Sequence, residues 1–278
     1  MKKTRLNLPI IIGLVFLAIV LLVAVFAEAL MPYSLSELSA PYARPSSAHP
    51  LGTNDIGQDI LSELLIGTRT TLLTGMTSAL FIIVIGTGIG LIGGYIGGRT
   101  DKALRGLTSV FMAVPQLPFA IVLVTFLEPG IWNIIIAICL TSWTTTARIV
   151  RAKVIEVKSM PFVLAEEAMG QRKIIIALRH ILPNIMDIVM MRATLAVSSA
   201  MLTEASISFL GLGVYNQKSW GAILYYAFRK NGVVAGLYWW YIPPLVCISL
   251  CIFAFVLIGY YGLGSSNTQA RKDYQVIG

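Results

Sequence analysis

The chain has 278 residues, of which 56% are hydrophobic and only 12% are charged, and its formal net charge is +8. Soluble domains carry about 25% charged residues, so most side chains of this chain must face something other than water. Together with a mean hydropathy of +0.79, this composition excludes an ordinary water-soluble globular protein and predicts an integral membrane protein.

Six apolar stretches are long enough, or nearly so, to cross a bilayer, since one crossing needs about 20 mainly apolar residues. In chain order they are Leu8–Leu30, Leu72–Tyr95, Leu107–Leu127, Ile131–Thr145, Ile185–Leu210 and Tyr241–Leu263. The fourth stretch is the shortest and ends in a run of Ser and Thr. Pro115 and Pro118 predict a kink in the third span, and the glycines between Gly86 and Gly98 predict either close helix contact or bending of the second.

The first apolar stretch has a second interpretation. Basic residues precede it and Ala27-Glu28-Ala29 lies near its end, which is also the pattern of a secretory signal peptide. Because the apolar run is longer than the roughly 7–15 residues of a signal core, the sequence favours an uncleaved first span.

The basic residues predict the orientation, because Lys and Arg in short loops prefer the cytoplasm. With the N-terminus inside, fifteen of the 21 basic residues fall in cytoplasmic segments and five in outer segments, while Arg192 lies within the fifth span. The inner set is Lys2, Lys3, Arg5, Arg99, Lys102, Arg105, Arg148, Arg151, Lys153, Lys158, Arg172, Lys173, Arg179, Arg271 and Lys272. The outer set is Arg44, Arg69, Lys218, Arg229 and Lys230. This distribution predicts that both termini lie inside, and it explains the positive charge without a nucleic-acid partner.

Three of the segments that connect the predicted spans are long and polar. Within the outer segment that joins the first two spans, Ile56–Thr70 has apolar residues at helical spacing, which predicts an amphipathic helix at the membrane interface. A cytoplasmic loop runs from about residue 148 to 184, and an outer loop runs from Gly211 to Trp240. We therefore divide the chain into residues 1–71, the first span with the outer segment, and residues 72–278, a five-helix core.

The cytoplasmic loop has the pattern of a helix–turn–helix. Gly170 ends a short helical run, and Pro183 opens the next helix. A short helix that projects from the bilayer can lie in a groove of a soluble partner and transmit the movement of that partner.

At these residues the chain resembles the inner-membrane permeases of ABC importers, whose signature is EAA, a glycine and an apolar-Leu-Pro ending. Here Gly170 and Pro183 are 13 residues apart (183 − 170), which matches the pattern. The chain is most similar to the C-type permeases of dipeptide, oligopeptide and nickel importers. The stretches that carry this resemblance are HPLGTNDIGQDILSELLIGTRTTL (His49–Leu72), ARIVRAKV (Ala147–Val154), RHILPN (Arg179–Asn184) and EASISFLGLG (Glu204–Gly213). They occur in order over nearly the whole chain.

The chain also departs from the family pattern at three places, one of which is Tyr215–Gly221, a shortened stretch after Gly213 that lacks the usual prolines. Leu164 stands where the family has the glutamate that opens EAA, and acidic residues follow instead at Glu166 and Glu167. Near the end of the last span, Tyr260 and Tyr261 replace the usual acidic residues. The departure at Leu164 leaves open which glutamate contacts the ATPase.

The resemblance implies a type I ABC importer permease fold of six membrane helices, with both termini inside, in the cytoplasmic membrane. It implies that the chain forms half of a translocation pathway for peptides or similar solutes, including nickel or metal–opine chelates, by alternating access. Its implied partners are a second, B-type permease, two ATPase subunits that bind ATP and Mg, and an extracytoplasmic substrate-binding protein. The chain has no GxxxxGK[ST] phosphate loop, so it is expected to be no ATPase itself and to bind no cofactor.

Two sets of residues are candidates for function. The ATPase-coupling set is Ser159, Leu164, Ala165, Glu166, Glu167, Ala168, Gly170 and Arg172, in which the two glutamates have the alternative of a solvated charged face. The pathway set is Met190, Arg192 and Glu204. Arg192 lies nine residues beyond Pro183, about 13 Å along the fifth helix, where a charge usually faces a cavity or a partner charge. It either lines the pathway and attracts an anionic group such as a peptide carboxylate, or it reaches toward the inner surface or pairs with a carboxylate of the partner permease. Met190 either lines the passage or packs against neighbouring helices, and Glu204 is either a gate or docking residue or only bonds the Gly211–Gly213 turn.

The predicted membrane topology also indicates roles for two arginines and for two outer segments. Arg148 and Arg151 are either positive-inside anchors or contacts to the ATPase. The segments Ser46–Arg69 and Gly211–Trp240 are candidate docking regions for the binding protein.

Two other classes of protein remain as alternatives. An ATP-independent secondary transporter or channel would usually show an internal repeat and broken helices with midplane ion sites, and the sequence shows no repeat. An intramembrane enzyme needs a nucleophile–base pair or a metal cluster, and the sequence has no GxSG or HExxH motif. His49 and His180 lie far apart and Cys139, Cys247 and Cys251 lie in apolar runs, so no metal site is predicted.

Overall fold

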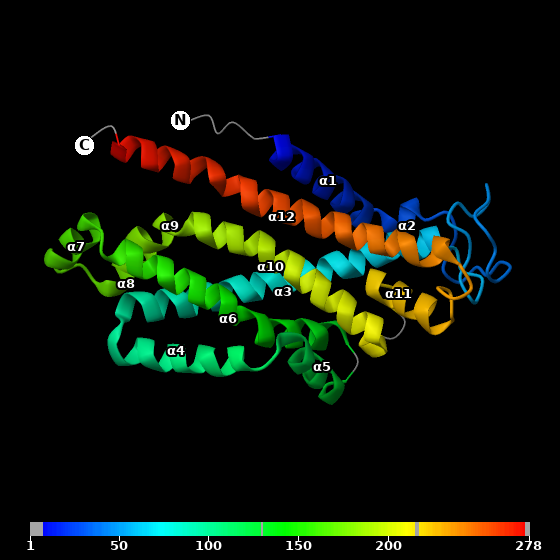
Figure 1. Ribbon diagram of the computed structural model, residues 1–278, viewed down its shortest axis with the longest axis horizontal. Helices are drawn as coiled ribbons and strands as arrows, with labels where there is room; N and C mark the ends of the chain where they lie inside the picture. Colours follow the sequence, from blue (N-terminus) through cyan, green and yellow to red (C-terminus); the bar gives the residue numbers. More distant parts are fainter. Residues whose placement is uncertain (1–7, 129, 215–216, 276–278) are drawn as a thin grey trace.

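The computed structural model describes residues 8–128, 130–214 and 217–275, with side chains as far as Gly262. Within these ranges the elements are helices, and Thr53 and Asp59 form one isolated β-bridge. The helices lie along one axis and build an elongated bundle (Figure 1). The longer elements are α1 (Leu8–Val25), α3 (Ile60–Ile96), α4 (Gly98–Ala113), α5 (Gln116–Phe126), α6 (Ile131–Lys158), α10 (Met186–Ile207), α11 (Trp220–Arg229) and α12 (Tyr238–Gln275). The shorter ones are α2 (Ala27–Leu30), α7 (Pro161–Ala168), α8 (Lys173–Ile175), α9 (Leu182–Asn184) and the π-helical segments η1 (Ile176–Ile181) and η2 (Ser208–Leu212).

The described helices confirm the predicted all-α membrane fold. Five of them are long and apolar enough to cross a membrane, namely α1, α3, α6, α10 with η2, and α12, and the number is six when the bent pair α4–α5 is counted as one broken span. The start of α1 and the end of α12 point toward the same end of the bundle as α7 (Figure 1), as an even number of crossings requires. The basic residues counted at the two chain ends lie outside the described side chains.

The structure corrects the amphipathic helix predicted at Ile56–Thr70. Residues 60–70 are the first turns of α3, which continues without interruption to Ile96. Asp59 caps this helix by accepting a hydrogen bond from the Ser62 N–H at 2.8 Å. No helix-breaking residue separates Thr70 from Leu72, so the backbone hydrogen bonds continue, and a division after residue 71 falls inside α3.

The third predicted span is broken and not merely kinked. α4 and α5 meet at 85°, and Val114 and Pro115 between them are non-helical. Val114 has an extended backbone (φ −89°, ψ 128°), because the ring of Pro115 disfavours a helical conformation at the residue before it. Pro118 lies in the first turn of α5, where its missing N–H breaks no hydrogen bond.

The fourth span is longer than predicted. α6 continues past Thr145 to Lys158, so the inner loop begins near residue 159 and not near 148. The Ser/Thr run does not end the helix, because such hydroxyl groups can bond back to the preceding turn, as Thr141 does to the carbonyl of Ala137 at 3.0 Å.

α3 and α6 pack at close range through glycines, as the second span predicts. A Cβ atom on Gly90 would lie 2.7 Å from the Ala147 carbonyl oxygen, and one on Gly94 would lie 2.8 Å from Cβ of Val154. Gly86 faces Thr146 in the same way, so the contact repeats every four residues along α3. Gly88, on another side of the helix, meets no atom within 4 Å.

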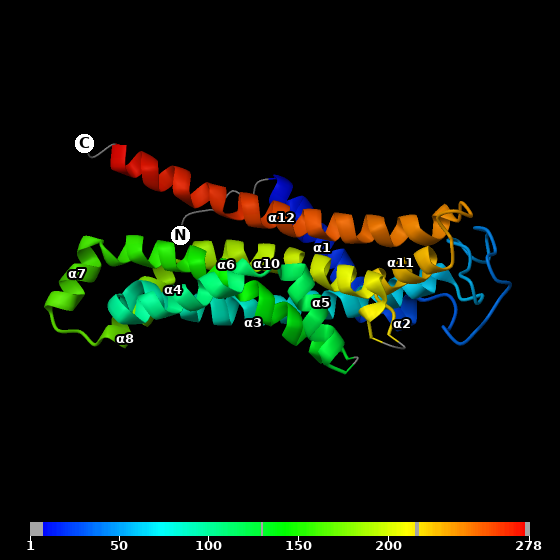
Figure 2. The same cartoon turned by 60° about the horizontal axis from the view of Figure 1, so that its bottom comes forward.

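The two sides of the bundle have different surfaces. α4 and α5 lie on the side opposite α1 and α12 (Figures 1 and 2). Large exposed side chains on α1, α12 and the outer face of α3 are apolar, for example Leu22, Val84 and Phe253, which suits contact with lipid. The opposite side exposes Ser109 and Arg148 as well, and polar side chains at such positions usually face a cavity or a partner.

Candidate coupling site and transport surface

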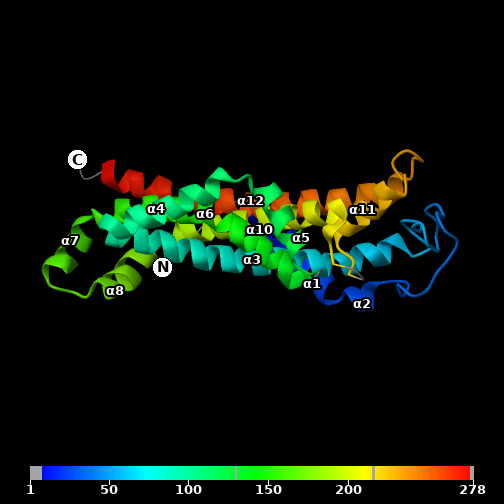
Figure 3. The same cartoon turned by 90° about the horizontal axis from the view of Figure 1, so that it is seen from below.

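The short helix α7 forms an elbow beyond the inner end of the bundle (Figure 3). Val163 is fully buried and packs in a cluster with Tyr95 of α3 and Val154 and Val157 of α6. On the same helix Leu164 is 51% exposed. α7 is therefore attached to the inner ends of two spanning helices by one face and presents its other face to the cytoplasm.

The turn after α7 depends on Gly170. Its φ of 77° lies in the left-handed region, where a residue with a Cβ is strained. The chain then runs through α8, η1 and α9, so the predicted helix–turn–helix is present. Pro183 lies in α9, three residues before α10 begins, and it does not itself open the long helix.

The two glutamates of α7 have different neighbours. Glu166 Oε1 lies 3.6 Å from His180 Nε2 of η1, which pairs the two arms of the elbow when the imidazole is protonated. The Glu167 carboxylate lies near Tyr95 at the inner end of α3, whose hydroxyl group has no hydrogen-bond partner among the described residues. Each acidic side chain thus has a neighbour inside the chain, and contact with an ATPase stays a prediction for both.

The remaining predicted coupling residues surround the elbow. Ser159 ends α6 and donates a hydrogen bond to the Glu156 carbonyl at 2.8 Å. Ala165, Ala168 and Arg172 are exposed, and Arg172 precedes the first turn of α8.

The two segments predicted to dock a binding protein lie against each other at the outer end. Lys218 Nζ contacts Glu63 Oε1 at 2.5 Å and Gln58 Oε1 at 2.9 Å, and Lys230 Nζ lies 3.0 Å from Asp55 Oδ2. The hydrogen bond to Asp55 raises the pKa of Lys230 above its usual value. These contacts tie the loop before α11 and the end of α11 to the start of α3, so a partner would meet one joined surface.

The three predicted pathway residues do not form one cluster. Met190 is 58% exposed on α10, while Arg192 is partly buried and its Nε has no hydrogen-bond partner among the described residues. Glu204 is buried and accepts a hydrogen bond from Ser208 at 2.7 Å. Since Arg192 and Glu204 are twelve residues apart, about 18 Å lies between them along the helix.

Glu204 belongs to the contact between α10 and α11. Its carboxylate also interacts with Ser219, the residue that caps α11. A Cβ atom on Gly221 would lie 2.6 Å from the Ala205 carbonyl oxygen, so α11 packs directly on the α10 backbone. Glu204 therefore lies where it can hold this junction, and its role as a gate stays a prediction.

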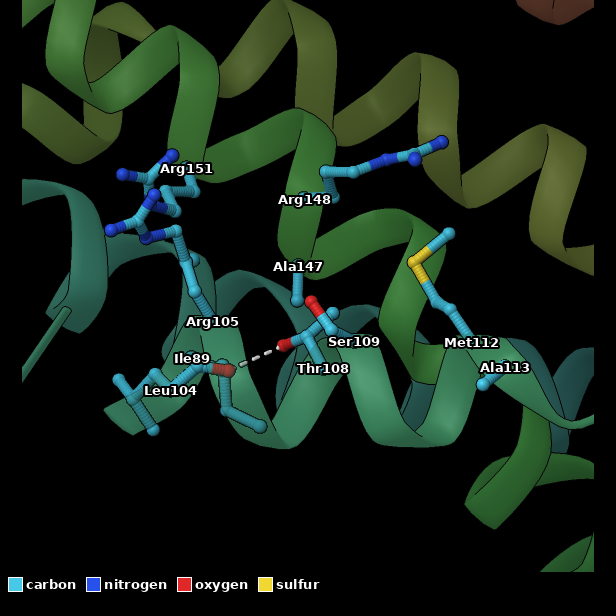
Figure 4. A pocket seen from close by; sticks show the side chains of 11 residues that line it. Ile89, Leu104, Arg105, Thr108, Ser109, Met112, Ala113, Ala147, Arg148 and Arg151 are labelled. Carbon is cyan, nitrogen blue, oxygen red and sulfur yellow. Dashed lines mark hydrogen bonds between the residues drawn. The ribbon is translucent and has the colours of Figure 1, made fainter. Parts of the chain in front are cut away.

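A cavity that was not predicted lies between α4 and α6 (Figure 4), and Ile89 and Gly90 of α3 also line it. Its volume is about 450 Å³, and its lining includes Arg105, Arg148 and Arg151. Farther along the same side, Gln116 beside the break in the third span donates a hydrogen bond to Ser142 at 2.6 Å. The signal available in the sequence was the spacing of Arg148 and Arg151 on a helix with Ser and Thr, but these arginines were interpreted as positive-inside anchors or contacts to the ATPase.

Within the described residues, no group of His, Cys, Asp and Glu is arranged to hold a metal ion. Cys139 and Cys251 are buried, and Cys247 is half-buried.

Up to six apolar crossings with an inner helical elbow, a joined outer surface and a polar side are the features of a membrane-embedded permease. The chain belongs to the family described as the binding-protein-dependent transport system inner membrane component, which residues 86–263 match. It is thus the permease component of a binding-protein-dependent ABC importer, embedded in the membrane.

Relatives cover most of the chain. The oligopeptide transport system permease protein OppC of Bacillus subtilis is 34% identical over 93% of this chain and 85% of its own length. The dipeptide transport system permease protein DppC of the same organism is 32% identical over 93% and 80% of the two chains. The glutathione transport system permease protein GsiD of Pectobacterium atrosepticum is 34% identical over 88% and 81%.

A solved structure has the same fold. A chain of the inward-facing MetNI methionine ABC transporter superimposes with a TM-score of 0.60 at 18% identity, covering 73% of this chain and 95% of that one. At this identity the likeness concerns the fold alone.

Proposed function

We propose that the chain forms half of the translocation pathway for peptides or peptide-like solutes and moves them by alternating access. A second, B-type permease completes the pathway, and two separate ATPase subunits bind ATP and Mg. A substrate-binding protein delivers the solute to the joined outer surface that contains Lys218 and Glu63. The relatives named for oligopeptide, dipeptide and glutathione transport support peptides as the solute class.

The attachment of α7 carries this proposal. Val163 fixes the helix to α3 and α6, whereas Leu164 faces away from the bundle. A soluble partner that moves α7 therefore moves the inner ends of two spanning helices with it. This is the geometry that a rigid-body change between inward-open and outward-open states needs.

Purification of the tagged chain in mild detergent tests the proposal. We expect two ATPase subunits and a second permease to co-purify, and reconstituted vesicles to take up trialanine only with ATP and the binding protein. Leu164→Asp should remove the ATPase subunits from the purified complex. Leu38→Asp, at an exposed leucine of the outer segment, is the matched control and should retain them.

Two results would contradict the proposal. A chain that purifies alone and transports without ATP would favour the secondary transporter or channel. Retention of the ATPase subunits in the Leu164→Asp complex would show that α7 is not the coupling helix. Uptake of nickel or of a metal–opine chelate stays a prediction, which the same vesicles test with the chelate in place of the peptide.

A further inference from the structure

The charges around the cavity between α4 and α6 do not balance. Arg151 and Arg105 share one carboxylate, that of Asp101, from which Arg151 Nε lies 2.5 Å and Arg105 Nε 3.3 Å. Arg148 has no ion-pair or hydrogen-bond partner within the described part of the chain. The lining therefore contains three guanidinium groups, two of which share the Asp101 carboxylate, and this excess of positive charge attracts anions.

Arg148 is the arginine available to a ligand. Figure 4 shows its side chain directed away from Arg105 and Arg151, along the cavity toward the end lined by Met112. The residue is exposed, unlike its neighbours Ala147 and Val150 on α6. A guanidinium group presents a planar fork of donors that fits a carboxylate in bidentate geometry.

The two faces of α4 indicate what fills the cavity. Arg105, Ser109 and Met112 line it, whereas exposed Leu107 and Val110 lie on the opposite face of the helix. An apolar face suits lipid or a partner helix, and a face with Arg and Ser suits a water-filled passage. The Gln116–Ser142 hydrogen bond continues this polar surface toward the break between α4 and α5.

We propose that this cavity binds the carboxylate group of the transported solute during its passage, with Arg148 as the main contact and Arg105 beside it. The proposal rests on the proposed function, because it assigns a place in the chain to one chemical group of a peptide. The volume of about 450 Å³ lies in the ordinary range of small-molecule sites, roughly 300–1,000 Å³. The site thus favours peptides with a free carboxyl terminus over neutral analogues.

A cysteine introduced at position 109 reports on the potential in the cavity. The importer complex carrying Ser109→Cys is treated, in inside-out membrane vesicles, with a negatively or a positively charged methanethiosulfonate. Each rate is divided by the rate of the same reagent with 2-mercaptoethanol, and the complex without the new cysteine is the blank. We expect the anionic reagent to be favoured about tenfold, and Arg148→Gln to lower this preference at least about threefold.

Lys102→Gln is the matched control, because Lys102 is an exposed cation on α4 that does not line the cavity. It should leave the preference for the anionic reagent unchanged. Trialanine at saturating concentration should slow modification of the introduced cysteine at least about threefold, and trialanine amide should not. Equal rates for the two reagents, or equal protection by the two peptides, would overturn the proposal.

ATP-dependent uptake separates this inference from the proposed function. If the complex takes up peptides with ATP but trialanine does not protect the cysteine, the carboxylate site is wrong and the proposed function stands. If trialanine protects the cysteine but no ATP-dependent uptake occurs, the site is supported and the proposed function is wrong.

Discussion

The guanidinium group of Arg151 holds the carboxylate of Asp101 by two hydrogen bonds, from Nε at 2.5 Å and from Nη2 at 2.8 Å. The pair joins α6 to the first turn of α4, and Arg105 approaches the same carboxylate from one turn farther along. Most side chains of α4 are exposed, with only Asp101 and Thr108 buried. The inner half of the broken third span is therefore fastened mainly at this point.

Removal of the Asp101 charge should loosen α4. Asp101→Asn leaves two arginines facing each other without a carboxylate, and we expect the free energy of unfolding in detergent to fall by roughly 2 kcal/mol, less than for a fully buried pair because Arg151 is partly exposed. Hydrogen exchange should rise in residues 98–113 before other parts of the bundle. Arg99→Gln, a nearby cation without this partner, should change neither quantity, and the same loss in both variants would contradict the role of the pair.

Because α3 packs closely on α6, alanine substitutions at different glycines of α3 should change the free energy of unfolding by different amounts. Gly90→Ala places a methyl group 2.7 Å from a backbone oxygen, so we expect a loss of about 1–3 kcal/mol in the free energy of unfolding. Gly88→Ala, two residues away with open space around it, should be neutral or stabilising by about 0.5 kcal/mol. Thermal unfolding of the two variants in one detergent measures the difference, and similar melting temperatures would speak against this packing.

The ion pair between Lys218 and Glu63 joins the outer loop to α3. The Glu63 side chain is only 3% exposed, so Lys218→Met leaves a buried carboxylate without its cation and should destabilise the fold by about 3–5 kcal/mol. Adding Glu63→Gln to Lys218→Met should restore most of this loss, because the unpaired charge is then absent. A double variant as unstable as the single one would show that packing, and not charge, explains the loss.

Substitutions at two neighbouring residues of α7 should separate the attachment of this helix to the bundle from its contact with the ATPase. Val163→Ala removes two methyl groups from a fully buried site, and we expect the free energy of unfolding to fall by about 2 kcal/mol. Leu164→Ala should leave this energy unchanged, because the side chain is half exposed, while it weakens co-purification of the ATPase. Chemical unfolding of the chain and pull-down of the complex measure the two effects. The reverse pattern would mean that the two faces of α7 are assigned wrongly.

The crossings could be predicted from sequence because their signal is local. Apolar runs of sufficient length give the spans, and the spacing of Gly170 and Pro183 gives the elbow. The close approach of α3 and α6 also follows from glycines four residues apart.

The ends of α3 and α6 could not be predicted, because apolar runs report where lipid is and not where hydrogen bonding stops. Residues 60–70 are polar enough to be taken for a separate interfacial helix, and residues 148–158 for part of a loop, yet each stretch belongs to a longer spanning helix. The cavity at Arg148 was equally out of reach, since its shape depends on the 85° break and on the pair between Asp101 and Arg151, which are 50 residues apart.

α3 has a consequence for how the two sides of the membrane communicate. Its 37 residues extend about 55 Å, from the Asp59 cap beside Glu63 to Tyr95 beside the elbow. The surface that would receive a delivered solute and the surface that would receive an energy-supplying subunit are thus the two tips of one uninterrupted rod. If occupancy of one tip alters affinity at the other, thermodynamic linkage requires the same factor in the return direction. The affinity of the outer surface for its partner would then depend on the occupancy of the inner surface through the single helix α3.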